Sequence, residues 1–510
     1  MENLSSLAPN TLPLLKKDNG FFNKLKETPL LQKLYNPVGF AFLILFAGII
    51  SLGISKFGPV FGILLLVVTI AIPAVYGIVM FPRFGIIILL VMAYVLFLLS
   101  RIGISGPIGI IMDALQFLMM LGLVLNQKKK NEWHLLKGPI STVILLWIAY
   151  NVLEVANPVT EARGAWIYTI RSVAIVLLSY FVFLYNIRTI QMVRFIFKLW
   201  LGLSFFAALY AFKQEYIGFS DAEEAYLHSD PAIASLLFIG GHWRKFSIFS
   251  DPVCFAYNMS MSSIFCIVLI AGKFPTWKKI ILALLTASFQ MASLFSGTRG
   301  ANVLVPAALL LFAILNYNKK VLIFTVIATM FLIVLINIPT GDPNLARFQT
   351  AFRPNNDDSY KLRKANQKRI QPYILSHPMG GGLGATGTWG QKFAPGSYLA
   401  NFPPDSGYIR IAVELGWLGL IIFCTMMFTF LKTGINYYYK IKDPEIKSYS
   451  LAMVLIIFAY NIANFPQEAL VQYPSNVYFS LEVALLTVLY RIDQEKQNQL
   501  IVPSSIPNTL

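Results

Sequence analysis

The sequence predicts an all-α protein, a polytopic bundle of transmembrane helices with about 12–14 spans and a large outer loop between two late spans. Of its 510 residues, 56% are hydrophobic and only 13% are charged, whereas about a quarter of the residues of a soluble protein are charged. A helix needs about 20 apolar residues to cross roughly 30 Å of hydrocarbon. Apolar runs that approach this length, several of them short, lie near residues 38–55, 60–80, 84–100, 106–126, 138–155, 166–186, 192–212, 252–272, 278–295, 301–316, 321–338, 408–431, 449–463 and 477–490.

Residues 1–36 form the first expected element, a cytoplasmic amphipathic N-terminus. Leucines and phenylalanines are mixed there with lysines, notably between Pro13 and Pro29, and this composition suits a helix lying on the inner leaflet. No short apolar stretch followed by a small-residue cleavage site is present. We therefore expect no removable signal peptide.

The positions of lysine and arginine predict the orientation of the spans. With the N-terminus inside, most short inside segments contain cations, for example residues 128–130 and the pair Lys319 and Lys320, and the short outside loops contain few. We therefore expect both termini in the cytoplasm, with residues 493–510 as a tail. The net charge of +17 follows mostly from this topology, so it does not indicate a nucleic-acid partner.

The same pattern divides the chain into membrane segments and outer insertions. Residues 37–338 are expected to hold transmembrane helices with an outer loop near 213–251, residues 339–406 a large extracytoplasmic loop, and residues 407–492 the C-terminal transmembrane helices. The large loop contains eight lysines and arginines against four aspartates and no glutamate. Long loops escape the rule that places cations inside, so this excess suggests an anionic ligand.

Arginines at the outer ends of several spans are the candidate anion-binding residues. Arg299 stands in a Ser-Gly-Thr-Arg-Gly turn, Arg244 leads into another span, and Arg163 and Arg171 lie about two helical turns apart at the start of a third. Guanidinium groups bind phosphate oxygens bidentately and stay charged, so several together match a pyrophosphate. An alternative for Arg299 is a side chain that extends to the lipid headgroups.

Asp405 is the best candidate for a general base, because it ends the basic loop and immediately precedes a span. Neighbouring cations are expected to lower its pKa and keep it ionised. The alternative is a helix N-cap for the span that begins near Tyr408. Glu414 is an acid within the same apolar run and is expected to pair with Arg410 at i, i+4.

His377 and the glycines at positions 380–384 form another candidate, since backbone amides in such a loop can bind phosphate. The alternative is a flexible turn with a solvated histidine. The chain has no Walker or dinucleotide motif, only four histidines and no clustered cysteines, so we expect no nucleotide cofactor and no protein-bound metal.

Three segments in order resemble the O-antigen ligase and polymerase superfamily. They are the stretch from Arg244 to Asp251-Pro252, the Ser-Gly-Thr-Arg-Gly turn, and His-Pro-Met-Gly at 377–380 followed by Asp-Ser-Gly-Tyr at 405–408 and Val-Glu-Leu-Gly-Trp-Leu-Gly at 413–419. The resemblance implies a glycosyltransferase at the outer face of the bacterial cytoplasmic membrane, without a cofactor. Its donor would be an undecaprenyl-pyrophosphate-linked glycan, and its acceptor a sugar hydroxyl on a lipid-linked glycan or lipid A core.

The resemblance also implies roles for individual residues. Arginines matching Arg244 and Arg299 hold the pyrophosphate, and a residue of the large outer loop activates the acceptor. Ligases commonly have histidine where this chain has Asp405, whereas an Asp-X-X-Tyr version ending at Tyr408 is familiar among exopolysaccharide polymerases, so we favour a polymerase.

Two other classes of function remain open. A secondary transporter or flippase for an anionic or lipid-linked substrate would place ionisable groups near the midplane of the membrane, whereas here they cluster at the outer ends of the spans. A non-catalytic assembly protein is the third possibility. Convergence of Arg244, Arg299 and Asp405 in one outward-facing cavity would favour an enzyme.

Overall fold

The computed structural model describes residues 37–101, 108–130, 132–239, 241–353 and 358–501, and the predicted amphipathic segment 1–36 lies outside them. The chain forms two compact units, Met1–Tyr76 and Gly77–Leu510. In the first unit, α3 (Pro37–Phe57) is followed by most of α4 (Pro59–Met80). Gly58 connects the two helices with a φ of +68°, a conformation that only glycine adopts at little cost.

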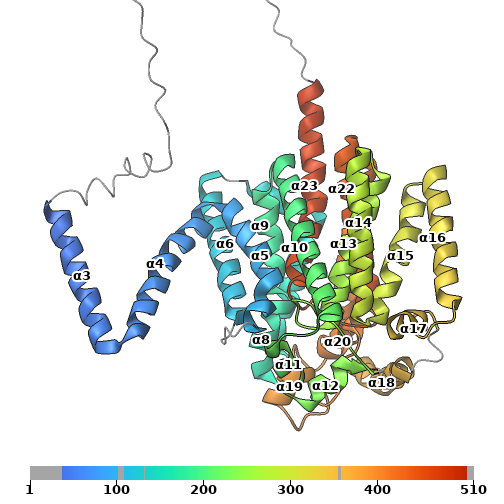
Figure 1. Ribbon diagram of the computed structural model, residues 1–510, viewed down its shortest axis with the longest axis horizontal. Coiled ribbons are helices and arrows are strands. Elements are labelled where there is room, and N and C mark those ends of the chain that lie inside the picture. Colours follow the sequence, from blue (N-terminus) through green and yellow to red (C-terminus); the bar gives the residue numbers. More distant parts are fainter. Residues whose placement is uncertain (1–36, 102–107, 131, 240, 354–357, 502–510) are drawn as a thin grey trace, which may run out of the picture. The chain divides into compact units, whose positions relative to one another are not determined.

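The second unit is a bundle of helices with two groups of short elements at one end (Figure 1). The prediction of an all-α fold is confirmed. The long helices are α5 (Pro82–Arg101), α6 (Ile108–Lys130), α7 (Pro139–Leu153), α10 (Ile190–Tyr216), α13 (Pro252–Ala271), α14 (Thr276–Phe295), α15 (Arg299–Leu315), α16 (Lys319–Asn337), α21 (Gly416–Lys440), α22 (Pro444–Ala463) and α23 (Ser475–Ile501).

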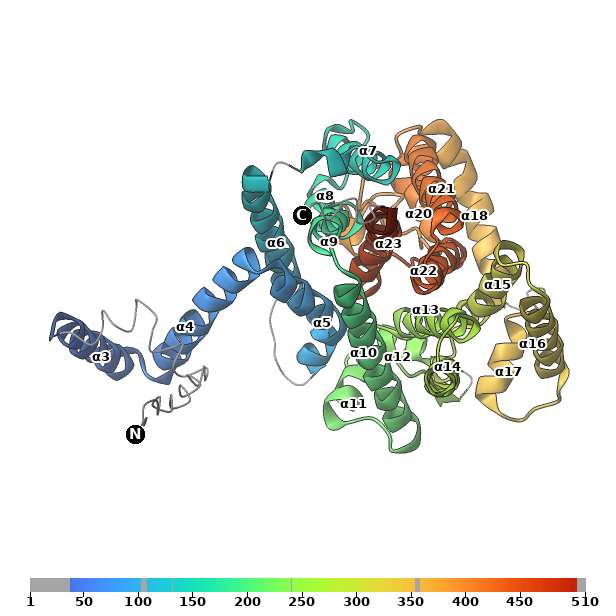
Figure 2. The same ribbon diagram turned by 90° about the horizontal axis from the view of Figure 1, so that it is seen from above.

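The centre of this bundle is built by α13, α22 and α23. Helix α13 packs against α14, α15 and α22, and α22 packs against α21 and α23. The arrangement is seen from above in Figure 2. Because α13 and α22 are predominantly apolar and mostly buried, their burial supplies much of the hydrophobic core.

Ten helical segments among the described residues are long and apolar enough to cross a membrane, so the chain is a multi-pass membrane protein. The described part of each apolar run is mostly helical, but the expected 12–14 spans exceed the ten segments. Helix α15, with 17 residues, is shorter than the ten. Helix α23 is long but includes Glu482 and Arg491 and continues to Ile501, into the predicted tail.

Two of the apolar runs are broken into shorter helices. Residues 166–186 form α8 (Arg163–Val173), a 3₁₀ turn (Ile175–Leu178) and α9 (Ser179–Asn186). Residues 408–431 form α20 (Gly407–Glu414) and then α21, and Gly416 between them has a φ of +69°. A break of this kind separates the expected site residues on α20 from the membrane span that follows.

Both expected outer insertions lie at the same end of the second unit, opposite the C-terminal end of α23 (Figure 1). The first contains α11 (Asp221–Leu227), α12 (Pro231–Leu237) and a hairpin of β1 (Phe238–Ile239) and β2 (His242–Trp243). The second contains α17 (Pro343–Thr350), α18 (Asp358–Ser376) and α19 (Gly387–Phe393). The large loop is therefore a folded helical insertion where it is described.

Four Asp-Pro pairs in the sequence explain where four of these helices begin. In each pair the aspartate is the N-cap and accepts a backbone hydrogen bond from the first turn, while proline occupies the first turn itself. Both preferences follow from the unpaired N–H groups at a helix start. The pairs begin α12, α13, α17 and α22 at Asp230, Asp251, Asp342 and Asp443.

Candidate active site

The loop between β2 and α13 is held in an unusual backbone conformation. Ser247 is fully buried and has a φ of +53°, a region in which a non-glycine residue costs about 1–3 kcal/mol. Its backbone N–H donates to Gln214 Oε1 at 2.8 Å, its hydroxyl donates to the Ala207 carbonyl at 2.6 Å, and its own carbonyl accepts from Arg101 Nη1 at 2.7 Å. These contacts fix the loop that carries Arg244.

Arg244 joins this loop to the turn between α14 and α15, residues 296–300. Its Nε donates to the Ser296 carbonyl at 2.8 Å and its Nη2 to Thr298 Oγ1 at 3.0 Å. A longer bond of 3.3 Å runs from Nη1 to the Leu236 carbonyl. A guanidinium has five N–H donors, so Arg244 can give two to the turn and one to Leu236 and still offer others to a ligand.

Three arginines from different segments gather at this turn. Arg299 begins α15, and Arg347 of α17 donates from Nε to the Gly297 carbonyl at 2.6 Å. The pKa of the Arg244 guanidinium is lowered to about 10, mainly by burial and also by the charges of Arg347 and Arg299, whereas Asp251 opposes the shift. The turn is thus a partly desolvated site with an excess of positive charge among the described groups that act on Arg244.

Gly297 allows the arginines to approach the turn closely. Its φ is +59°, and a Cβ at this position would lie 3.0 Å from Arg347 Cδ and 3.6 Å from Arg244 Cγ. A side chain here would strain the backbone and displace Arg347. The structure therefore requires glycine at position 297, the first glycine of the Ser-Gly-Thr-Arg-Gly motif.

Asp405 is half-buried immediately before α20. Burial raises its pKa, and the positive charge of Arg363 on α18 only partly opposes this. The expected lowering of the Asp405 pKa is therefore wrong, because the loss of water around the carboxylate outweighs the one cation that acts on it. The alternative role as a helix N-cap is also wrong, because Ser406 is the N-cap of α20.

The charge of Arg363 on α18 acts on groups from two segments of the site. It lies within electrostatic range of both the Asp405 carboxylate and the Tyr257 hydroxyl of α13. Tyr257 in turn lies against the start of α15, where a Cβ on Gly300 would be 3.0 Å from its hydroxyl. Gly300 follows Arg299, so Arg363 and Tyr257 are the residues that relate Asp405 to the start of α15. That Asp405 shares one cavity with Arg244 and Arg299 stays a prediction.

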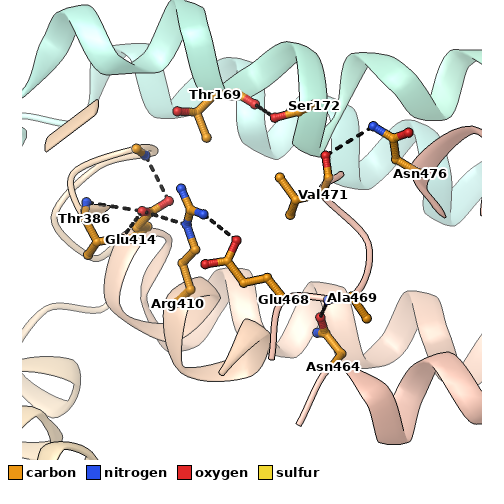
Figure 3. A network of polar contacts seen from close by, with 11 residues as sticks. Thr169, Ser172, Thr386, Arg410, Glu414, Asn464, Glu468, Ala469, Val471 and Asn476 are labelled. Atoms are coloured by element: carbon orange, nitrogen blue, oxygen red, sulfur yellow. Dashed lines mark hydrogen bonds and ion pairs between the residues drawn. The ribbon is translucent and has the colours of Figure 1, made fainter. Parts of the chain in front are cut away.

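Arg410 of α20 lies between two glutamates, Glu414 and Glu468 (Figure 3). Its Nε donates to Glu414 Oε1 at 3.0 Å, which confirms the predicted pair, and its Nη1 pairs with Glu468 Oε2 at 2.5 Å. Burial alone would lower the Arg410 pKa, but the two carboxylates outweigh it and raise the pKa above its ordinary value. Gly407, Arg410, Ile411 and Glu414 line one cavity together with apolar side chains of α7, α21 and α23.

The glycine loop, residues 380–384, packs onto the corner between α20 and α21. The backbone amides of Gly381 and Gly382 donate to the carbonyls of Val413 and Glu414, each at 2.9 Å. Gly384 N donates to Glu414 Oε2 at 2.9 Å, and the Thr386 amide and hydroxyl donate to Oε1. Phosphate binding by these amides is therefore contradicted, because the protein itself uses them.

His377 and Tyr408 make contacts within the protein. The His377 ring stacks on Tyr373 with centroids 4.0 Å apart, and its Nδ1 lies 3.0 Å from the Tyr373 carbonyl. The Tyr408 hydroxyl donates to the Asn461 carbonyl at 3.1 Å. These contacts orient both side chains, and their roles in chemistry remain predictions.

Arg163 and Arg171 lie apart from the arginine turn. Arg171 Nη1 pairs with Asp113 Oδ2 of α6 at 2.7 Å, and Arg163 is exposed. Helices α8 and α15 stand on different sides of α23 in Figure 2, and Arg171 pairs with α6 rather than with the arginine turn. The expected convergence thus includes Arg244 and Arg299 only.

Sequence reasoning did not single out Arg347, Arg363, Glu215 or Glu468. The Asp-Pro pair at 342–343 is a local signal for the start of α17, but nothing in the sequence indicates what that helix contacts. Glu468 stands between two late apolar runs and is detectable only as an acid near the membrane boundary. Within the described parts of the chain, no three His, Cys, Asp or Glu side chains are grouped as a metal site requires.

Comparison with known families identifies the region that contains most of this site. Residues 280–424 match the family model described as O-antigen ligase, which confirms the resemblance to the O-antigen ligase and polymerase superfamily. The matched region includes Arg299, Arg347 and Asp405, whereas Arg244 precedes it. No curated protein matches the sequence.

Proposed function

We propose, from its place in the O-antigen ligase and polymerase superfamily, that this protein is a metal-independent membrane glycosyltransferase. It transfers a glycan from an undecaprenyl-pyrophosphate carrier to a sugar hydroxyl at the outer face of the bacterial cytoplasmic membrane. Ligases commonly have histidine where this chain has Asp405, so we favour a polysaccharide polymerase. Its acceptor would then be another lipid-linked glycan. Both termini are cytoplasmic in this proposal.

Arg244 and Arg299 would bind the pyrophosphate of the donor. Guanidinium forks match phosphate oxygens, and desolvation strengthens these bonds. When the bond between the anomeric carbon and the pyrophosphate oxygen breaks, the electron pair stays on the pyrophosphate. Fixed cations at that oxygen stabilise the developing charge.

Asp405 would be the general base. The acceptor oxygen forms the new bond to the anomeric carbon, and its proton passes to the Asp405 carboxylate. A carboxylate whose pKa is raised by burial accepts a proton more readily than an ordinary aspartate, so it is a better base near neutral pH. Arg363 would keep the carboxylate oriented and ionised before the reaction.

The observation that carries the proposal is the gathering of Arg244, Arg299 and Arg347 at one turn of the outer end. In this proposal the base Asp405 faces that turn, as a transfer from a pyrophosphate donor needs. In this proposal the donor is recognised through its phosphates, so the sugar that it carries is free to vary.

A reconstituted assay tests the proposal directly. The purified protein in lipid nanodiscs should lengthen an undecaprenyl-pyrophosphate-linked glycan and release undecaprenyl pyrophosphate, also in the presence of EDTA. Asp405→Asn should lower turnover about 10²- to 10⁴-fold, while the matched control Asp230→Asn, at the N-cap of α12, should not. No donor consumption by the wild type would reject the proposal.

The choice between polymerase and ligase needs a cellular measurement. Deleting the gene and separating the surface glycan on a gel distinguishes loss of chain length from loss of attachment. We expect short glycans that are still attached. Full-length glycan that is no longer attached would indicate a ligase.

A further inference from the structure

Glu215, in the last turn of α10, joins the two outer insertions. Its Oε2 lies 3.2 Å from His242 Nε2 and 3.3 Å from Lys245 Nζ, and its Oε1 accepts from Asn344 Nδ2 of α17 at 3.3 Å. The side chains of Glu215 and Lys245 are only 13% and 6% exposed. Since His242 and Lys245 flank Arg244 in the chain, Glu215 fixes the segment that carries Arg244.

The same carboxylate also fixes Arg347. Asn344 and Arg347 are three residues apart on α17, so they lie on one face of the helix. With Asn344 bound to Glu215, Arg347 reaches the Gly297 carbonyl through Nε at 2.6 Å. Helix α17 also packs against α14 and α15, the two helices that the turn connects.

Three guanidinium groups beside one turn repel one another, most strongly where water is excluded. Arg244 shows this effect, because Arg347 is the strongest of the charges acting on it. An anion with several negative charges at the turn would remove the repulsion. Binding of such a ligand and docking of α17 against the turn would therefore favour each other.

We propose that Arg347 is a third guanidinium of the donor site, brought to the pyrophosphate by the large outer loop and positioned there by Glu215 through Asn344. This inference rests on the proposed function and extends it. The large loop then binds the donor's anionic group with its first helix and carries the base, Asp405, at its end. The large loop would thus link binding of the donor to the position of the base that activates the acceptor.

Binding of inorganic pyrophosphate to the purified protein tests this role without requiring turnover. Arg347→Ala should weaken binding about 10- to 100-fold, the range for a charged hydrogen bond. Arg347→Lys keeps a point charge without a fork, so it should fall between alanine and wild type. The matched control is Arg353→Ala, in the same insertion, where Nη2 donates to the Ile336 carbonyl and Asn337 Oδ1 rather than to the turn; binding should be unchanged.

A second variant tests the positioning role. Asn344→Ala should raise the KM for the lipid-linked donor several-fold while kcat and the thermal unfolding midpoint stay near wild type. Equal pyrophosphate binding by wild type, Arg347→Ala and Arg353→Ala would overturn the inference, as would a wild type that binds no pyrophosphate. The proposed function is judged separately by wild-type turnover of the lipid-linked donor, so the two failures are distinguishable.

Discussion

Replacing Glu414 by glutamine should destabilise the corner where the glycine loop meets α20 and α21. The Glu414 side chain is only 2% exposed and accepts from Arg410 Nε, Gly384 N, and the amide and hydroxyl of Thr386. A glutamine keeps the shape but removes the charge and turns one acceptor into a donor that faces donors. Removing one partner of a buried ion pair costs about 3–5 kcal/mol. Because Arg410 keeps Glu468, we expect the lower end, about 3 kcal/mol.

Unfolding of the purified protein in mixed micelles measures this change, with limited proteolysis of residues 380–390 reporting whether the glycine loop is released. The matched control is Glu224→Gln, since the Glu224 side chain is 50% exposed and surface changes usually stay within about 0.5 kcal/mol. Glu414 was also a secondary candidate for the base. An unchanged unfolding free energy with turnover reduced 100-fold or more would refute the structural role and assign Glu414 to the chemistry.

The remaining predictions concern the base, the arginines and the topology. Because burial raises the Asp405 pKa, the folded state binds this proton more tightly than the unfolded chain, and stability falls as pH rises from the ordinary aspartate range through the folded pKa. Asp405→Asn should therefore be at least as stable as wild type at pH 7, and wild-type turnover should fall as pH drops through the raised pKa; a less stable variant would contradict the shift. Arg299→Lys should lose about 2–4 kcal/mol of transition-state stabilisation, measured as kcat/KM, and full-length polymer from a normally expressed Arg299→Ala would reject its role. Arg244→Lys should lower thermal stability as well, because it also loses bonds to the turn. A reporter fused within 355–370 should be external and one near Lys319 cytoplasmic; the same side for both would refute the orientation.

The sequence was sufficient to predict the fold class because membrane helices depend on composition and length alone. The four helix starts at Asp-Pro pairs also follow from local backbone chemistry, although they were not among the predictions. The break at Gly416 was not predictable, since its backbone conformation is set by contact with the distant Pro378. The pKa of Asp405 was misjudged for a related reason: cations close in the chain need not be close in space, and only Arg363 acts on it strongly enough to matter.

The contact between the glycine loop and Gly416 has a consequence for exchanging segments between related proteins. A Cβ on Gly416 would lie 2.0 Å from the Pro378 carbonyl, and one on Gly380 would lie 2.4 Å from Gly416 N. The two segments therefore meet backbone to backbone, with no side chain that could adapt to a foreign partner. A chimera that transplants the outer loop to alter glycan choice should carry its border beyond Gly416, because a border at residue 406 would pair two surfaces from different parents at their tightest contact.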